Sequence, residues 1–399
     1  MPDTSPVMIA DVDATYQPTQ NERLRQGIVS ALRKFASADL RLEMQRDYET
    51  RVQPALLTKN AAPKDWRDVD AAMTSEASYR FYSVMRYNAQ EMVWHSVQDP
   101  VERGLPQMIE AAERIAATRP TGGSLRLNPD FEVPRYVAGI DVHLIPGSYD
   151  WPGNGSHIAQ GAVVSHGAAV FYASMPNLRG IGGGVGESIA RWLKASRPDF
   201  KPRRMLDIAT GIGRNLFPYI GIFADVEAHG LDVAAPGLRY GHAIAERDGL
   251  TVHFSQQSAD RIDYPDGHFD LIVSSFFFHE VPVKTTQQIL NECHRLLAPG
   301  GIMVHMELPP EKMLDPWDNF RWNWDTANNN EPNYTLYRSQ DPAKLCAAAG
   351  FDPARAFEMH IPNYETFGAA NFAKFVRGEM PAPAHAMGGW YVFGAEKAG

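Results

Sequence analysis

The chain has 399 residues and carries 38 basic against 47 acidic side chains, which gives a formal net charge of −9. A chain of this length can bury a sizeable core and has room for two domains. The acidic balance argues against a nucleic-acid-binding protein, because such proteins concentrate Lys and Arg on their surface. A hydrophobic content of 44% and a charged content of 21% are ordinary for a globular protein in water.

The cysteines and the apolar runs bear on where the protein resides. Cys293 and Cys346 each fall in an apolar helical pattern, which predicts buried thiols and leaves no disulfide framework. The first residues do not combine a basic segment with an apolar run, and no stretch approaches the roughly 18 apolar residues of a membrane span. The sequence therefore predicts a cytoplasmic protein.

The first part of the chain is predicted to be mainly helical. Apolar residues recur at helical spacing over 21–57, and further helical patterns cover 76–97 and 106–118. We expect these helices to belong to an N-terminal accessory or substrate domain, residues 1–195. Five aromatic residues of the second pattern are predicted to pack in the core, with a substrate wall as the alternative. They are Tyr79, Phe81, Tyr82, Tyr87 and Trp94.

Two later segments of the same half are rich in residues typical of strands. Residues 136–146 and 161–174 predict a hairpin or a small sheet. His143, His157 and His166 fall in or near them, and a histidine metal site is one interpretation. No spacing among the three is diagnostic of a metal, so we favour histidines held in structural hydrogen bonds and predict no metal site.

The stretch Arg204 to Gly213, R-M-L-D-I-A-T-G-I-G, predicts a buried strand that ends in a glycine turn at the start of a helix. Glycine suits a turn that a ligand must approach closely. A second strand, 226–233, brings Asp232 about twenty residues past the glycines, where a carboxylate can take both hydroxyls of an adenosine ribose. Leu216 stands where a dinucleotide fold needs its third glycine, so no pyrophosphate site is implied.

Four motifs in order resemble those of class I S-adenosylmethionine-dependent methyltransferases. They are Asp207-x-Ala209-x-Gly211-x-Gly213, Asp232, D-G-H-F-D-L-I-V from Asp266, and L-L-A-P-G-G from Leu296. The resemblance covers roughly Arg203 to Gly399. It implies an α/β fold, a Rossmann-like and mostly parallel seven-stranded sheet, with S-adenosyl-L-methionine as the cofactor. We therefore expect residues 196–399 to form the cofactor-binding methyltransferase domain.

The resemblance also implies which residues hold the cofactor, at the carboxyl ends of the strands. They are Asp207, Ala209, Thr210, Gly211, Gly213, Asp232, Val233, Ser258, Ala259, Ser274 and Ser275. Two positions depart from the family pattern. Ala209 stands where the family usually has glycine, and Ser258 stands where an acidic residue often holds the adenine amino group. Either the Ser258 hydroxyl fills that place or Asp260 reaches in from a shifted turn.

Methyl transfer from a sulfonium is an in-line displacement, for which an enzyme supplies alignment and, for some acceptors, a base. By resemblance His279 lies near the acceptor, and its imidazole titrates near neutral pH, so it is the first base candidate. Glu307, at the tip of the fifth strand, is the second. The alternatives are a His279 that bonds a loop or caps a helix and a Glu307 that is solvated or ion-paired.

An insertion over 311–338 is unusually dense in aromatic residues. They are Trp317, Phe320, Trp322, Trp324, Tyr334 and Tyr337. Such residues can close over a ligand and exclude water, or they can pack against the N-terminal domain. The sequence does not choose between the two.

Together these observations predict a methyltransferase that acts on a small molecule, with oxygen as the favoured acceptor atom. Nitrogen, carbon and sulfur acceptors stay open. Neither nucleic acid nor membrane is expected as a partner, and the sequence is compatible with a homodimer. The alternative is a non-catalytic S-adenosylmethionine-binding subunit whose N-terminal domain binds a protein partner. A nicotinamide-dependent oxidoreductase is a third reading, against which the missing third glycine argues.

Overall fold

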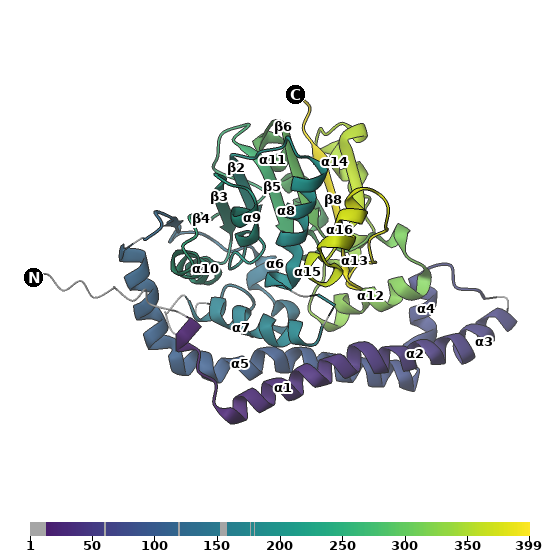
Figure 1. Cartoon of the computed structure of the whole chain (residues 1–399). Coiled ribbons are helices and arrows are strands. Elements are labelled where there is room, and N and C mark those ends of the chain that lie inside the picture. Colours follow the sequence, from purple (N-terminus) through teal and green to yellow (C-terminus); the bar gives the residue numbers. More distant parts are fainter. Residues whose placement is uncertain (1–12, 60, 119, 152–157, 176, 179) are drawn as a thin grey trace, which may run out of the picture.

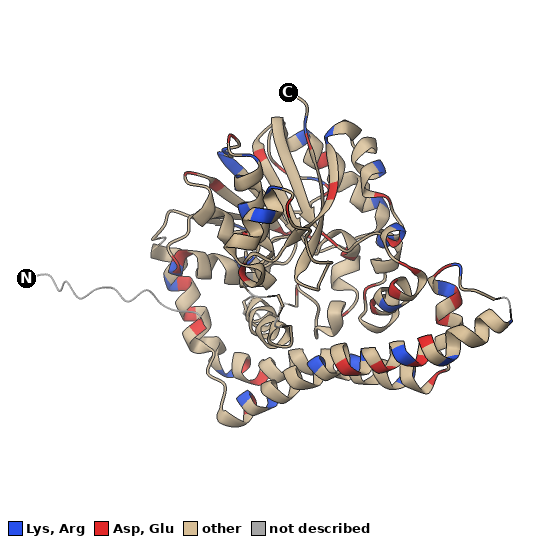
Figure 2. Cartoon of the chain, turned by 45° about the vertical axis from the view of Figure 1, so that its right-hand side comes forward, with Lys and Arg blue, Asp and Glu red and all other residues tan. Residues whose placement is uncertain are grey.

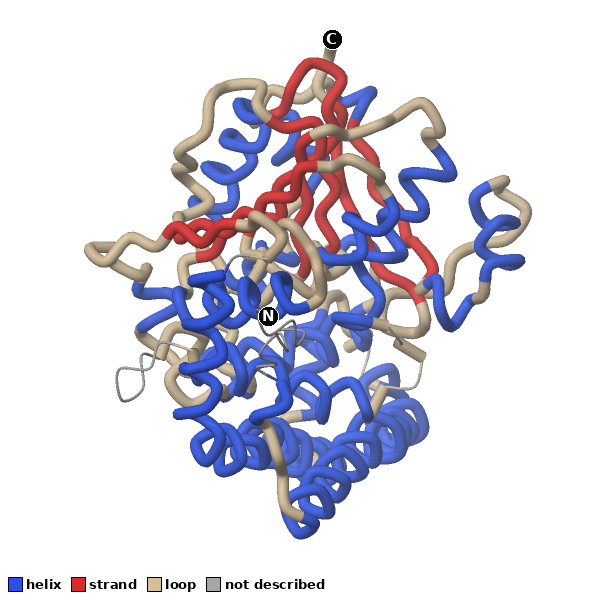
Figure 3. The backbone as a smooth tube through the Cα atoms, turned by 60° about the vertical axis from the view of Figure 1, so that its left-hand side comes forward, coloured by secondary structure: helices blue, strands red, loops and turns tan. Residues whose placement is uncertain are grey.

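A sheet covered by helices lies on a layer of long N-terminal helices (Figure 1). The structure is a computed structural model that describes residues 13–59, 61–118, 120–151, 158–175, 177–178 and 180–399. Figure 3 shows the two parts as an upper region that holds the strands and a lower region built of helices. The boundary that the sequence suggests near residue 195 stays a prediction.

The sheet has eight strands in the order β1-β4-β3-β2-β5-β6-β8-β7. β8 runs antiparallel to β6 and β7, while the other neighbours are parallel. The strands are β1 (Ser124–Arg126), β2 (Arg204–Ile208), β3 (Glu227–Asp232), β4 (Val252–Gln256), β5 (Phe269–Ser275), β6 (Leu297–Met306), β7 (Ala356–Pro362) and β8 (Gly389–Glu396). The expected Rossmann-like, mostly parallel sheet is confirmed, with one strand more than seven because β1 joins it from the N-terminal half.

The central strands are largely buried because both faces of the sheet are covered. Met205, Leu206 and Ile208 of β2 are fully buried. Successive side chains of a strand point to opposite faces, so Met205 packs in one apolar cluster while Leu206 and Ile208 pack in the other. This two-sided burial explains the short unbroken apolar run that the sequence shows before the glycine turn.

The helices that follow β1 cover the sheet or carry the insertion. They are α6 (Arg135–Ala138), α7 (Ala159–Ala173), α8 (Val185–Ser196), α9 (Phe217–Ile222), α10 (Ala235–Arg247), α11 (Val283–Leu296), α12 (Pro316–Asn328), α13 (Tyr334–Arg338), α14 (Pro342–Ala348), α15 (Tyr364–Phe367) and α16 (Ala369–Val376).

The helical layer confirms the helices expected in the first part of the chain. Its members are α1 (Gln20–Phe35), α2 (Arg41–Asp47), α3 (Gln53–Thr58), α4 (Trp66–Met73) and α5 (Ala77–Thr118). Short π-helical turns join α1 to α2 and α2 to α3. Figure 2 shows that acidic and basic residues alternate along these long helices. Among the described helices, none combines the length and apolarity needed to cross a membrane.

The β-rich interpretation of 136–146 and 161–174 is wrong. The first segment contains α6 and a 3₁₀ turn over Val142–Leu144, and the second lies in α7. α7 packs between α5 and α10 and is buried on several sides. A helix surrounded in this way shows no 3.6-residue pattern, so its Val, Ala and Phe residues resemble a buried strand.

The aromatic insertion packs against the helical layer through part of its surface. Trp317, Phe320 and Trp324 are buried in one apolar cluster with residues of α2, α4 and α5. The rings of Trp317 and Tyr48 stack with centroids 4.4 Å apart. Other insertion residues, including Trp322, line the cavity described below. Packing against the helical layer is therefore confirmed for part of the insertion, and closure over a ligand stays a prediction.

Candidate active site

A cavity of about 1010 Å³ lies where the carboxyl ends of the sheet strands meet the helical layer. Its walls include Ala209 and Asp232 from strand ends, Trp94 from α5, Tyr172 from α7 and Trp322 from α12. A volume of this size is at the upper end of small-molecule sites. It has room for a nucleoside cofactor and a second small molecule.

The turn after β2 is held from within by Asp207. One carboxylate oxygen of Asp207 accepts from the Thr210 hydroxyl at 2.7 Å and the other from the Asn215 amide at 2.8 Å. Burial raises the pKa of this carboxyl to about 7, against the lowering effect of the two hydrogen bonds. Ala209 adopts a φ of 55°, a left-handed conformation that explains why glycine is common at this place. Asp207 therefore braces the turn rather than facing the cavity.

Asp232 bonds the backbone of the turn after β2 and also lines the cavity. Its carboxylate oxygens accept from the backbone N–H of Gly211 and of Ala234, each at 2.8 Å. Each oxygen keeps capacity for a second hydrogen bond, so a ligand hydroxyl can be held there. A Cβ added at Gly211, where φ is 56°, would meet no atom within 4 Å and would project into open space. The residues present therefore fit a ribose that lies against this turn.

The predicted cofactor residues divide into two groups. Those that line the cavity are Ala209, Gly211, Asp232, Val233, Ala259 and Ser275. The lining does not include Asp207, Thr210, Gly213, Ser258 or Ser274. The Ser258 hydroxyl bonds Asp260, and the Ser274 hydroxyl lies 2.8 Å from Nδ1 of His305, so both are engaged within the protein.

Glu307 fixes the loop that carries His279. One oxygen of Glu307 accepts from the backbone N–H of Phe277 at 2.6 Å and of Phe278 at 2.5 Å. The other lies 2.8 Å from Nδ1 of His279 and accepts from the backbone N–H of Leu308 at 2.9 Å. The Glu307 side chain is fully buried and its acceptor capacity is taken up. Glu307 therefore orients the His279 ring through Nδ1, so that Nε2 points away from Glu307.

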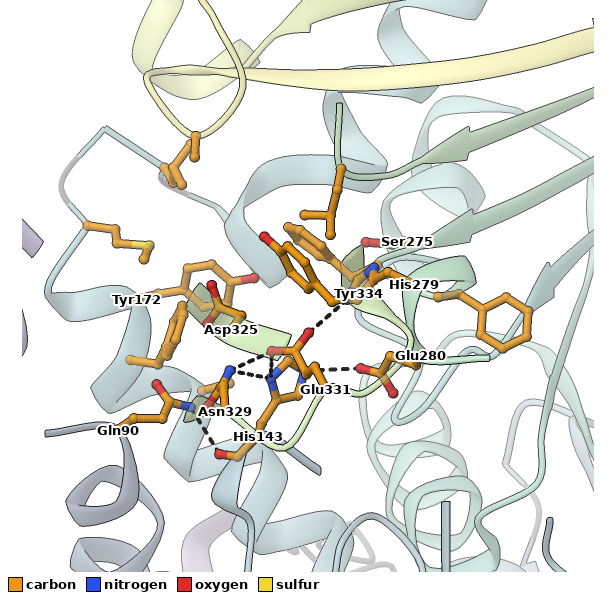
Figure 4. A pocket seen from close by; sticks show the side chains of 18 of the residues that line it. Gln90, His143, Tyr172, Ser275, His279, Glu280, Asp325, Asn329, Glu331 and Tyr334 are labelled. Atoms are coloured by element: carbon orange, nitrogen blue, oxygen red, sulfur yellow. Dashed lines mark hydrogen bonds and ion pairs between the residues drawn. The ribbon is translucent and has the colours of Figure 1, made fainter. Parts of the chain in front are cut away.

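The other side of the His279 ring faces residues from distant parts of the chain (Figure 4). Nε2 of His279 lies 3.5 Å from one oxygen of Glu331, whose other oxygen lies 3.0 Å from Nδ1 of His143. Nε2 of His143 lies 3.0 Å from Glu280, which also accepts from the Tyr149 hydroxyl at 2.9 Å. We call the side chains of His143, His279, Glu280, Glu307 and Glu331 the His–Glu cluster.

His143 reaches the cluster because its backbone is held in an unusual conformation. Its φ is 54°, in the left-handed region. Its carbonyl accepts from the Trp94 indole at 2.8 Å and from the Gln90 amide at 3.2 Å, so α5 anchors this residue. The helical layer therefore places one of the two imidazoles of the cluster.

The carboxylates change the acidity of both imidazoles. Burial lowers the pKa of His279, but Glu307, Glu331 and Glu280 outweigh it and raise the pKa to about 9. The same balance, with Glu331 and Glu280 as the charged neighbours, raises the pKa of His143 well above its ordinary value. The cluster therefore holds positive charge among its carboxylates at neutral pH.

Residues 205–301 match the methyltransferase domain family. The C-terminal part of this chain is a class I S-adenosylmethionine-dependent methyltransferase domain. Demethylmenaquinone methyltransferase of Thermus thermophilus is 37% identical over 109 residues, which are 27% of this chain and 49% of that protein. Ajmaline N-methyltransferase of Rauvolfia serpentina is 30% identical over 127 residues, 30% of this chain and 43% of that protein. The chain thus spans about half the length of these relatives.

One solved structure aligns along almost the whole chain. A Nostoc punctiforme protein with a proposed O-methyltransferase activity covers 96% of this chain and all of that one, at 14% identity and a TM-score of 0.44. S-adenosylmethionine is the cofactor of the methyltransferase domain, in agreement with the fit of the Asp232 turn to a ribose.

The His–Glu cluster contains residues that the sequence did not indicate as functional. Glu331 was one acid within an Asn-rich part of the insertion, and Glu280 was only the neighbour of His279. His143 was noted as a histidine without a diagnostic spacing, and its partner His279 lies far along the chain. His157 and His166 were considered with His143 as a possible metal site. The ring of His166 stacks on Tyr16 with centroids 3.6 Å apart, and His157 lies outside the described residues.

Proposed function

We propose that this protein transfers the methyl group of S-adenosylmethionine to a hydroxyl oxygen of a small molecule that is enclosed in the cavity. The observation that carries the proposal is the continuity of the cavity. The same lining contains the Asp232 turn of the methyltransferase domain and His279, His143 and Glu331 of the His–Glu cluster. The donor and an acceptor can therefore meet in one continuous space.

The walls of the cavity favour a flat and largely apolar acceptor. Aromatic side chains line it on several sides, and they come from the helical layer, the insertion and the sheet edge. They are Trp94, Tyr136, Tyr149, Phe171, Tyr172, Phe276, Trp322, Trp324, Tyr334 and Trp390. Rings of this kind stack on planar molecules and exclude water from the reacting atoms. The named acceptors of the relatives, demethylmenaquinone and ajmaline, are also small molecules, which supports the proposed class.

Oxygen is favoured over nitrogen because of what the cluster can do with a proton. A hydroxyl is a weak nucleophile until its proton is removed, whereas a neutral amine attacks without such help. Nε2 of His279 and Oε2 of Glu331 lie 3.5 Å apart at the cavity wall. We propose that the Glu331 carboxylate of this pair receives the acceptor's proton, and that Glu307 orients the His279 ring beside it.

The test measures S-adenosylhomocysteine formation against matched pairs of hydroxyl and amine compounds that share one aromatic ring system. We expect turnover with hydroxyl members, and mass spectrometry should place the methyl group on oxygen. Methylation of only the amine members, or of only RNA or protein, would contradict the proposal. Cofactor binding without turnover on any acceptor would favour the non-catalytic alternative. The cytoplasmic location and the homodimer stay predictions from the sequence.

A further inference from the structure

The two imidazoles of the His–Glu cluster share one arrangement. In each ring Nδ1 faces a buried carboxylate, Glu331 for His143 and Glu307 for His279, and Nε2 is turned away from that carboxylate. Histidines that bind metals are held in this way, since a carboxylate on one ring nitrogen fixes the ring and makes the other nitrogen a better ligand. Here the arrangement occurs twice, on rings from different parts of the fold.

The atoms that could serve as ligands also lie close together. One such atom from each of His143, His279 and Glu280 lies within 4.8 Å of the others. The 3.0 Å between Nε2 of His143 and the Glu280 oxygen is about the separation of two ligands that sit roughly 2.1 Å from one ion at a right angle. Together these atoms make a candidate ligand set of two nitrogens and one oxygen.

A second observation, on Glu331, indicates that the cluster lacks a positively charged partner. Oε2 of Glu331 is buried and accepts no hydrogen bond from the described residues, and its ion pair with Nε2 of His279 is long, at 3.5 Å; the side chain is 2% exposed and lines the cavity. A buried carboxylate oxygen without a partner is costly. In addition, three glutamates surround two imidazoles, and the neighbouring Arg86 is already paired with Asp325 at 2.8 Å. The cluster has room for further positive charge.

We propose that His143, His279 and Glu280 bind a divalent first-row transition metal ion, with Glu331 at the edge of the site. Two imidazoles and one carboxylate suit Zn²⁺, Fe²⁺ or Mn²⁺ better than Mg²⁺ or Ca²⁺, which prefer oxygen ligands only. Three protein ligands leave coordination positions open toward the cavity, as in catalytic metal sites. The metal-binding part of this inference stands apart from the proposed function.

The chemical role of the ion rests on the proposed function. The acceptor hydroxyl binds the ion through oxygen, which lowers the pKa of that hydroxyl. Its proton passes to Oε2 of Glu331. The oxygen then forms a bond to the methyl carbon as the carbon–sulfur bond breaks, and that electron pair stays on sulfur. The products are the methyl ether, neutral S-adenosylhomocysteine and one proton held by Glu331.

The test uses the full chain, freed of metal by a chelator and dialysed, and then titrated with Zn²⁺ or Mn²⁺ in a calorimeter without acceptor. We expect one ion per chain, confirmed by elemental analysis. His143→Gln and Glu280→Gln should each weaken the affinity for the metal ion more than 100-fold. Glu331→Gln should weaken it about 10- to 100-fold, because Glu331 orients the ring of His143. His294→Gln is the matched control, because His294 packs against Phe351 outside the cavity and should leave affinity unchanged.

Binding of S-adenosylmethionine by each variant shows whether the variant is folded. Absence of a bound ion in the wild type would overturn the metal site, as would folded His143→Gln and Glu280→Gln variants that bind the ion as tightly as the wild type does. The two proposals fail separately. Methyl transfer to a hydroxyl by metal-free protein, without loss of rate, leaves the function standing and removes the metal. Stoichiometric metal binding without any methyl transfer leaves the metal site standing and removes the proposed function.

Discussion

At the scale of the residue, Asp232 and Asp207 show that two acids in one turn have different tasks. Asp232 bonds the backbone of the turn and lines the cavity, whereas Asp207 bonds Thr210 and Asn215 and is 1% exposed. The sequence motif located both residues because they are close in the chain. It could not separate their roles, which depend on where the turn directs each carboxylate.

Asp232→Ala should weaken S-adenosylmethionine binding by about 10- to 100-fold, because hydrogen bonds to a charged group contribute roughly 1.5–3 kcal/mol each. Calorimetric titration of the folded variant measures the loss. Asp199→Ala is the control, since Asp199 is exposed and far from the lining of the cavity. Equal affinities for both variants would mean that the ribose is held elsewhere.

Asp207 should make the stability of the protein depend on pH. Its folded-state pKa of about 7 lies above the ordinary 3.8, so the folded protein keeps a proton that the unfolded chain releases. The stabilisation is fully present below about pH 4 and is lost as pH rises toward 7, by roughly 1 kcal/mol per pH unit. Urea unfolding of the wild type and of Asp207→Asn across this range measures the difference. A constant difference between the two proteins would contradict the assignment.

His279→Ala should lower the rate of methyl transfer by about 10²–10⁴, whether the ring acts beside Glu331 or holds an ion, because the acceptor then loses part of its activating group. The affinity for S-adenosylmethionine should change little, since the ribose site lies at Asp232. Single-turnover rates and cofactor titration separate these effects. A variant that loses only acceptor affinity would show that His279 positions the acceptor without activating it.

At the scale of the element, α7 links helix packing to the active site. Gly167 lies against the Trp94 ring, whose indole donates to the carbonyl of His143. A Cβ at Gly167 would stand 2.5 Å from that ring. The sequence suggested a strand here, because a helix surrounded by other helices lacks an exposed polar face. The glycine that permits the close approach of α7 and α5 has no signature of its own in the sequence.

Gly167→Ala should therefore destabilise the protein by about 1–3 kcal/mol through overpacking, and it should slow methyl transfer by displacing Trp94 and His143. Gly27→Ala, within α1, is the matched control. A Cβ at Gly27 would meet no atom within 4 Å, so this change should stabilise the protein by up to about 1 kcal/mol. Chemical denaturation measures both, and a neutral Gly167→Ala would argue against the packing of α7 on α5.

At the scale of the whole molecule, the His–Glu cluster is assembled from four parts of the chain, one of which supplies Glu307 directly after β6. His143 comes from the helical half, His279 and Glu280 follow β5, and Glu331 belongs to the insertion. The cofactor turn could be predicted because its motif is local. The cluster could not, because its members are far apart in sequence and meet only when the helical layer and the insertion pack together.

Arg86 of α5 and Asp325 of α12 hold these parts together through two hydrogen bonds of 2.8 and 2.9 Å. Arg86→Met should destabilise the protein by about 3–5 kcal/mol, because Asp325 is left as a buried and unpaired charge. The double variant Arg86→Met with Asp325→Leu should recover much of that loss. Unfolding free energies of the four proteins in this cycle measure the coupling, and additive effects would show that the pair does not join the two parts.

The most direct test of the whole account is a crystal structure of the full chain with S-adenosylhomocysteine. We expect the ribose hydroxyls on the Asp232 carboxylate, the nucleoside over Gly211, and the sulfur turned toward the His–Glu cluster across the cavity. A cofactor bound outside this cavity, or one whose sulfur faces away from His279, would contradict the claim that donor and acceptor meet here.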